Sequence, residues 1–164
     1  MIPIRVYLDT SVINFLFAED APESCEVTTR FFEDYVRCGL YDTYVSSLVI
    51  DEIMRLRDDE RRGILLNVIS MYNLDVIQVS DSEVQTLTLA EQYLNEGILP
   101  RSEVDDAIHV AVATVNEMDV LLSWNFKHLA NINKEFRFRE VNRRNGYTKP
   151  LRLCTPWEMM YEKA

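Results

Sequence analysis

The chain has 164 residues, 48% of them apolar and 27% charged, which is the size and composition of one globular domain and excludes disordered, collagen-like and coiled-coil proteins. Its net charge of −10 disfavours broad nucleic-acid binding, because contacts with phosphates need Lys and Arg. No apolar run approaches the ~20 residues of a membrane-spanning helix, we expect no secretory signal, and three widely spaced cysteines favour free thiols. We therefore expect a single cytoplasmic domain over residues 1–164, with no membrane contact.

In the first half of the chain, short β-prone runs alternate with helical patterns. Expected strands are Ile4–Leu8, Thr43–Ser46 and Asp75–Val79. Expected helices are Glu26–Cys38, Leu48–Arg57, Glu60–Tyr72 and Asp81–Glu96. Side chains of Asp9, Thr10 or Ser11 are candidates to cap a helix after the first strand, and Ser46 or Ser47 to cap the helix after the second.

The second half continues the same alternation. A nearly all-apolar helix is expected from Ser102 to Glu117, opened by Ser102 and Asp105 as a capping pair. A buried strand follows at Val120–Trp124, then an edge strand at Leu151–Cys154 and a last helix after Thr155 with Pro at its first position. Strands that alternate with helices predict an α/β three-layer sandwich, in which a mostly parallel sheet of four to five strands has helices on both faces.

Positive charge is concentrated in one segment. Between Lys127 and Arg152 eight Lys or Arg stand against two Glu, whereas the rest of the chain has nine basic and 25 acidic residues. Such a segment favours either local contact with a polyanion or a solvated basic loop, and both alternatives stay open. The candidate RNA-contacting residues are Arg137, Arg139, Arg143 and Arg144.

Three acidic residues stand where ligand sites of parallel sheets occur, at the carboxyl ends of the strands. Asp9 follows the first strand directly, Glu52 lies in the helix after the second strand, and Asp106 lies early in the apolar helix. Ser123 and Asn125 follow the fourth expected strand at the same edge. Converging carboxylates repel one another and imply a cation between them, and oxygen ligands without a His or Cys cluster indicate Mg²⁺ or Mn²⁺.

Each of these residues also has a plainer interpretation. Asp9 could serve as a helix cap and Glu52 as a surface acid. Asp106 lies inside an apolar helix, where an acid is unusual and indicates a specific role. His109 lies one turn after Asp106 and could pair with it, but a hydrogen-bonded core histidine is the more ordinary role. His128 is expected to be structural or at the surface.

Four segments in order carry a resemblance to a known family. Val6–Ile13, Ser46–Ile53, Asp106–Ala113 and Leu121–Leu129 resemble the four successive motifs of PIN domains, and their order, spacing and the chain length match as well. The chain looks most like the small prokaryotic PIN proteins related to VapC-type toxins. The resemblance covers essentially the whole chain.

The resemblance implies a metal-dependent endoribonuclease acting on single-stranded RNA. Asp9, Glu52 and Asp106 would hold one or two Mg²⁺ or Mn²⁺ ions, a metal-activated water would attack the phosphate, and the products would carry a 5′-phosphate and a 3′-hydroxyl. Ser123 matches a hydroxyl position that supports the site. The family also implies a homodimer and, for the toxins, an antitoxin partner whose tail fills the acidic groove.

Asn125 departs from the family pattern, because many members have a fourth Asp there. Its carbonyl oxygen could still face a metal-bound water, but without charge a second ion would bind more weakly. The sequence therefore leaves open an active one-ion nuclease, a slower nuclease, and a non-catalytic PIN-fold module that binds RNA or protein. An aspartyl-phosphate enzyme is disfavoured because no second Asp follows Asp9 by two residues, and a nucleotide-cofactor enzyme because no glycine-rich phosphate loop is present.

Overall fold

A computed structural model of the chain describes residues 2–160. Its centre is a five-stranded, entirely parallel sheet in the order β3-β2-β1-β4-β5. The strands are β1 (Arg5–Leu8), β2 (Asp42–Ser46), β3 (Asp75–Ile77), β4 (Val120–Leu122) and β5 (Arg152–Cys154). Tyr7 at the centre is in register with Tyr44 on one side and Leu121 on the other.

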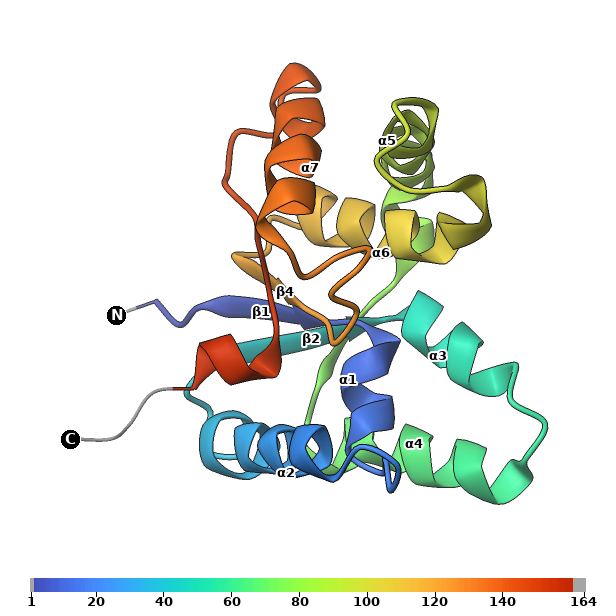
Figure 1. The fold of residues 1–164 in the computed structure, drawn as a ribbon, viewed down its shortest axis with the longest axis vertical. Coiled ribbons are helices and arrows are strands. Elements are labelled where there is room, and N and C mark those ends of the chain that lie inside the picture. Colours follow the sequence, from blue (N-terminus) through green and yellow to red (C-terminus); the bar gives the residue numbers. More distant parts are fainter. Residues whose placement is uncertain (1, 161–164) are drawn as a thin grey trace.

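Helices cover both faces of this sheet, as Figure 1 shows. One face carries α1 (Thr10–Phe15), α2 (Pro22–Phe31) with its π-helical continuation η1 (Phe32–Val36), α3 (Ser47–Met54) and α4 (Asp59–Met71). The other carries α5 (Glu83–Asn95), α6 (Val104–Val115) and α7 (Ile132–Arg144). Short 3-10 turns lie at η2 (Val79–Ser82), η3 (Arg101–Glu103) and η4 (Pro156–Met159). The expected α/β three-layer sandwich is confirmed.

The two central strands, β1 after Arg5 and the whole of β4, are apolar because each contributes to two cores. In β1, Val6 and Leu8 pack with α1–α4, whereas Tyr7 between them packs with α5–α7. β4 alternates in the same way, with Leu121 on the α6 side. Side chains of a strand alternate between faces, and here both faces are buried. In these two strands polar side chains of the site are therefore found beyond the carboxyl ends, at Asp9 and Ser123.

Half of the basic segment forms the helix α7, so the alternative of a solvated basic loop was wrong for Ile132–Arg144. Asn131 opens α7, where its side-chain oxygen accepts a hydrogen bond of 2.9 Å from the backbone N–H of Lys134. Phe138 and Val141 are buried one turn apart and anchor the helix against β5 and α5. So few apolar residues in a charged helix give a weak periodic signal, which explains why the sequence did not predict it.

The predicted helix caps were also wrong. Asp9 and Ser46 stand at the N-caps of α1 and α3, but neither side chain makes a capping hydrogen bond. Ser102 lies within η3 rather than at a cap, and Asp105 instead forms a 2.7 Å ion pair with Arg55, which directly follows α3. Polar side chains at these helix starts are therefore available for other contacts. Among residues 2–160, no helix is both long and apolar enough to cross a membrane.

Candidate active site

Five polar residues that the sequence singled out meet at the carboxyl edge of the sheet. Asp9 directly follows β1, and its backbone N–H bonds the carbonyl of the last residue of β4 at 3.2 Å. Ser123 continues β4, and Asn125 lies two residues further along. Glu52 comes from α3 and Asp106 from the first turn of α6. Four separate parts of the chain are therefore needed to assemble this edge.

Asp9 is buried, with 3% of its surface exposed, and hydroxyl groups surround it. Ser11 Oγ donates a hydrogen bond to Asp9 Oδ1, lies 3.4 Å from Ser123 Oγ, and accepts from the backbone N–H of Trp124 at 3.0 Å. Burial raises the pKa of Asp9, an effect that nearby His109 and the Ser11 and Ser123 hydroxyls offset in part. A nearby cation stabilises the ionised form of such a buried carboxyl group.

Glu52 is held by a buried histidine. His109 Nε2 donates to Glu52 Oε1, and His109 Nδ1 lies 2.7 Å from Tyr7 Oη, which in turn lies 2.8 Å from Ser46 Oγ. Burial lowers the pKa of His109, but the hydrogen bond and charge of Glu52 outweigh it, so that the net pKa is raised. His109 is thus a hydrogen-bonded core histidine, and its partner is Glu52 rather than Asp106.

Asn125 is bound on both ends of its amide. Its Nδ2 donates to Asp106 Oδ2 at 3.1 Å, and its Oδ1 accepts from the backbone N–H of His128 at 3.1 Å. The Asn125 carbonyl oxygen thus already accepts one hydrogen bond from the loop backbone, and its second lone pair is left for the expected metal-bound water. The amide also orients Asp106, which an ionised aspartate at this position could not do.

The charges of the acids act on one another. Burial raises the pKa of Asp106 to about 7, positive charge on His109 opposes the shift, and the charges of Asp9, Glu103 and Glu52 increase it. Since such interactions fall off with distance and screening, Asp9, Glu52 and Asp106 share one electrostatic environment. Strongly shifted carboxyl groups that lie together are typical of functional sites.

The chemistry of these donors suits a hard divalent cation, since each offers carboxylate oxygens and the set repels itself without positive charge. Within residues 2–160, however, no three His, Cys, Asp or Glu side chains are already grouped as metal ligands. Asp9, Glu52 and Asp106 are the residues that would hold the ion, and of these Glu52 also bonds His109. Mg²⁺ needs only one or two carboxylates, because it keeps several of its waters.

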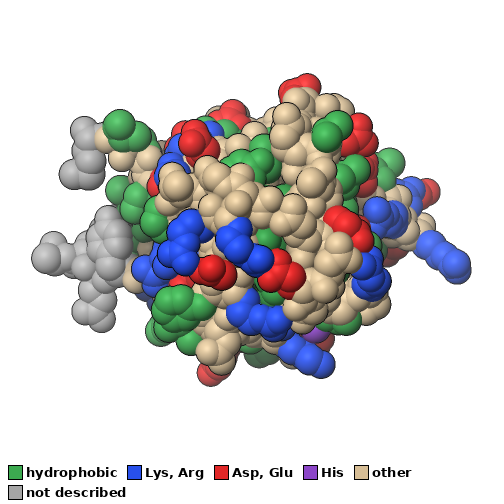
Figure 2. Space-filling view, turned by 90° about the horizontal axis from the view of Figure 1, so that it is seen from above, with side chains coloured by type: hydrophobic (Ala, Val, Ile, Leu, Met, Phe, Trp, Pro, Cys, Tyr) green, Lys and Arg blue, Asp and Glu red, His purple; other side chains and the backbone are tan. Residues whose placement is uncertain are grey.

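The four candidate RNA-contacting arginines lie on α7, outside this site, and have partners there. Arg143 pairs with Glu140, and Arg144 is 2.5 Å from Glu96. Two others bond backbone carbonyls: Arg137 that of Glu96 and Arg139 that of Leu151. Figure 2 looks onto the side that carries α5 and α7, where Lys and Arg side chains alternate with Asp and Glu. The positive charge of the segment is therefore partly neutralised.

The sequence missed two residues of the site, Ser11 and Tyr7, and the pairing of His109 with Glu52. A signal existed for each of the two residues. A tyrosine in a strand buried on both faces needs a partner for its hydroxyl, which Tyr7 finds in Ser46 and His109. Ser11 lies two residues after Asp9, in reach of its carboxylate. These signals concern pairs of residues whose geometry one sequence does not define.

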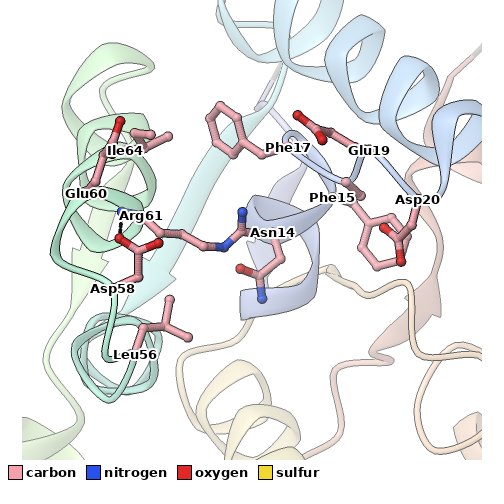
Figure 3. A pocket seen from close by; sticks show the side chains of 11 residues that line it. Asn14, Phe15, Phe17, Glu19, Asp20, Leu56, Asp58, Glu60, Arg61 and Ile64 are labelled. Carbon is pink, nitrogen blue, oxygen red and sulfur yellow. Dashed lines mark hydrogen bonds between the residues drawn. The ribbon is translucent and has the colours of Figure 1, made fainter.

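A cavity of about 810 Å³ lies apart from the acids, between α1 with the segment after it and the α3–α4 region. Figure 3 shows the side chains of Asn14 and Arg61 facing each other, and the backbone N–H of Arg61 donates to Asp58 Oδ1 at 3.1 Å. Its rim is acidic, through Glu19, Asp20, Asp58 and Glu60. Asp9, Glu52 and Asp106 do not line this cavity, so it is a separate feature of the surface.

Fold and site together define an α/β protein with a parallel sheet and an acidic cluster at its carboxyl edge. A crystal structure of VapBC2 from Rickettsia felis, bound to a DNA fragment from their promoter, contains a chain of similar fold, with a TM-score of 0.52 and 14% sequence identity over 76% of this chain and 90% of that chain. At this identity the likeness concerns the fold, which is PIN-like as expected. No protein-family model matches the sequence, and no curated protein sequence does.

Proposed function

We propose that this protein is a metal-dependent endoribonuclease that cleaves single-stranded RNA. The observation that carries the proposal is that Asp9, Glu52 and Asp106 come from separate elements to one edge of the sheet, where burial, and to a smaller extent the charge of Glu52, raises the pKa of both aspartates. The PIN-like fold supports it, since that resemblance implies ribonuclease activity. The proposed ion is Mg²⁺ or Mn²⁺.

In this proposal the side chains of the chain divide the work. Asp9, Glu52 and Asp106 hold the ion. The hydroxyls of Ser11 and Ser123 fix Asp9. The Asn125 amide keeps the Asp106 carboxylate turned toward the site. When bound, a divalent ion lowers the pKa of a water molecule and neutralises charge that builds up on the phosphate.

Cleavage of a single-stranded RNA by wild type and Asp9→Asn in Mn²⁺ tests the proposal. We expect cut products with 5′-phosphates from the wild type and a loss of at least about 100-fold in rate for Asp9→Asn, since removal of one catalytic electrostatic group costs about that much. Asp81→Asn, the same change at an exposed acid outside the site, should cut like wild type. Equal rates for Asp9→Asn and wild type, or no cleavage by the wild type with any divalent ion, would refute it.

A non-catalytic PIN-fold module that binds RNA or protein is the second candidate. It is favoured by Asn125 in place of a fourth acid and by the lack, among residues 2–160, of a preformed group of three metal ligands. A ligand that binds the native state raises thermal stability. A melting temperature that Mg²⁺ and Mn²⁺ leave unchanged would favour this candidate over the nuclease.

The proposal includes two partners besides RNA: a second copy of the chain and an antitoxin protein. The structural neighbour is itself part of a VapBC2 assembly. A net charge of −10 suits a partner with basic side chains, because an Arg presented to the acidic edge would replace the cation. We expect the product of a small adjacent open reading frame to form a stable complex on co-expression and to inhibit cleavage.

A further inference from the structure

A second cavity, of about 510 Å³, lies beside the acidic edge, between α2, the loop after β4 and η4. Both tryptophans of the chain, Trp124 and Trp157, line it together with Phe126. Ligand pockets commonly span about 300–1,000 Å³, so one planar ring system fits here easily. The proposed nuclease activity assigns no role to these three aromatic rings.

Trp124 forms a fixed wall of this cavity. Its indole Nε1 donates to Thr28 Oγ1 at 2.9 Å, and its ring packs against Phe15 at 5.6 Å between centroids. Two different contacts thus determine how the ring is oriented. A rigid aromatic face loses little conformational entropy when another flat group stacks on it.

Phe126 and Trp157, in contrast, present their rings to solvent. Phe126 is 59% exposed and lies edge-on to Trp124 at 6.1 Å and 70°, and Trp157 is 60% exposed. Neighbouring exposed aromatic rings beside a cavity mark a binding surface more often than a random surface position. They are the side chains on which single-stranded nucleic acids stack their bases.

The acids do not line this cavity, but Trp124 connects it to the acidic edge. The backbone N–H of Trp124 donates to Ser11 Oγ at 3.0 Å, and the same hydroxyl donates to Asp9. Trp124 also directly follows Ser123, the hydroxyl that supports Asp9. A strand whose phosphate lies at Asp9 would therefore have a neighbouring nucleotide close to Trp124, one wall of the aromatic cavity.

The charges around the cavity indicate which part of a nucleotide would enter it. Glu23 and Glu26 line it, and among the described residues of its lining Arg30 is the only Lys or Arg. Two carboxylates repel a phosphate, so the sugar–phosphate backbone is disfavoured inside. An uncharged base does not meet this repulsion, and its faces suit the aromatic walls.

We propose that the cavity formed by Trp124, Phe126 and Trp157 is a stacking subsite for one unpaired base of the RNA strand held at the acidic edge. The subsite rests on the proposed function, since it needs a nucleic-acid strand at Asp9. It would make the enzyme select single-stranded RNA, because a base within a duplex is not free to enter.

Intrinsic fluorescence tests the subsite directly, because both tryptophans of the chain line it. The Asp9→Asn protein, which should leave RNA uncut, is titrated in Mg²⁺ with a single-stranded RNA hexamer, the same hexamer in a duplex, and an abasic ribose–phosphate chain of equal length. We expect saturable quenching by the single strand and none by the other two. Equal quenching by the abasic chain would overturn the proposal.

Variants separate this subsite from nonspecific binding. Phe126→Ala and Trp157→Ala, at exposed positions, should each weaken binding of the single strand by at least about five-fold, the lower end of what loss of one stacking partner costs. Phe136→Ala, at a 62% exposed Phe on α7 outside the cavity, is the matched control and should bind like the parent. Equal affinity of the Phe126 and Phe136 variants would overturn the proposal, as would a fluorescence change on protein dilution without RNA, which would assign the surface to a second copy.

RNA cleavage by variants that keep Asp9 distinguishes failure of the proposed subsite from failure of the proposed nuclease activity. If Phe126→Ala and Trp157→Ala cut RNA with unchanged KM, the subsite is refuted and the nuclease stands. If no variant or wild type cuts RNA but the base-dependent quenching is present, the subsite stands and the nuclease is refuted.

Discussion

His109 on α6 and Glu52 on α3 are joined by a hydrogen bond between Nε2 and Oε1, inside the edge where the acids gather. His109 is 1% exposed, so its removal would leave Glu52 and Tyr7 without this partner in a buried setting. We expect His109→Ala to lower the free energy of unfolding by about 2–4 kcal/mol, the cost of unpaired buried polar groups. Urea denaturation measures it, and His128→Ala, at the other histidine, should change stability much less.

Asp106 gives the metal-free protein a pH dependence. Its pKa is about 7 in the folded state against an ordinary 3.8, so between these values the folded state holds a proton that the unfolded state has released. The stability that this proton contributes is then fully present below about pH 4 and is lost as the pH rises through 7. We expect the melting temperature in chelator to fall from pH 5 to pH 8, and Asp106→Asn to flatten the fall. A fall equally steep in Asp106→Asn would show that other groups cause it.

Asn125→Asp tests how the Asp106 carboxylate is oriented. The substitution replaces an amide donor, 3.1 Å from Asp106 Oδ2, with a fourth negative charge. We expect lower stability in chelator at pH 8 and a larger gain on addition of Mn²⁺ than in wild type, because repulsion between carboxylates is what the ion relieves. Asn125→Ala, which removes the donor without adding charge, should show the first effect weakly and no larger Mn²⁺ gain. Melting curves with and without the ion separate the two variants.

A separate prediction concerns whether the arginines of α7 contribute to RNA binding. If Arg143 and Arg144 bind phosphates, Arg143→Glu with Arg144→Glu should weaken binding of single-stranded RNA and flatten its dependence on salt, by about 0.7 in the log–log slope for each phosphate that the variant no longer binds. Both side chains already pair with Glu140 and Glu96, so RNA binding must displace these pairs. An unchanged slope would assign the arginines to the helix surface alone.

The sequence predicted the sheet well because its signal is local. Buried parallel strands such as β1 and β4 are short apolar runs, and their polar successors Asp9 and Ser123 mark the carboxyl edge without any knowledge of contacts. The α6 helix followed from an equally local apolar pattern. A highly charged helix such as α7 could not be predicted, because its two apolar anchors are too few to define a period.

The site was predictable in its residue types but not in its pairings. The apolar residues around Asp106 in the chain were enough to indicate that this acid has a specific role. That Asn125 bonds to it and His109 to Glu52 depends on the angle between loop and helix, which the sequence does not state. The predicted caps failed for a related reason: the hydroxyl of Ser46 bonds Tyr7, a tertiary partner, instead of its own helix.

A calorimetric titration with Mn²⁺ tests the central claim, that Asp9 and Asp106 bind one divalent cation. The account predicts saturable binding of an ion to wild type and to Asp81→Asn, and an affinity at least about ten-fold lower for Asp9→Asn and Asp106→Asn, since each removes a charged ligand. Equal affinity in all four proteins, or no binding to wild type, would contradict it.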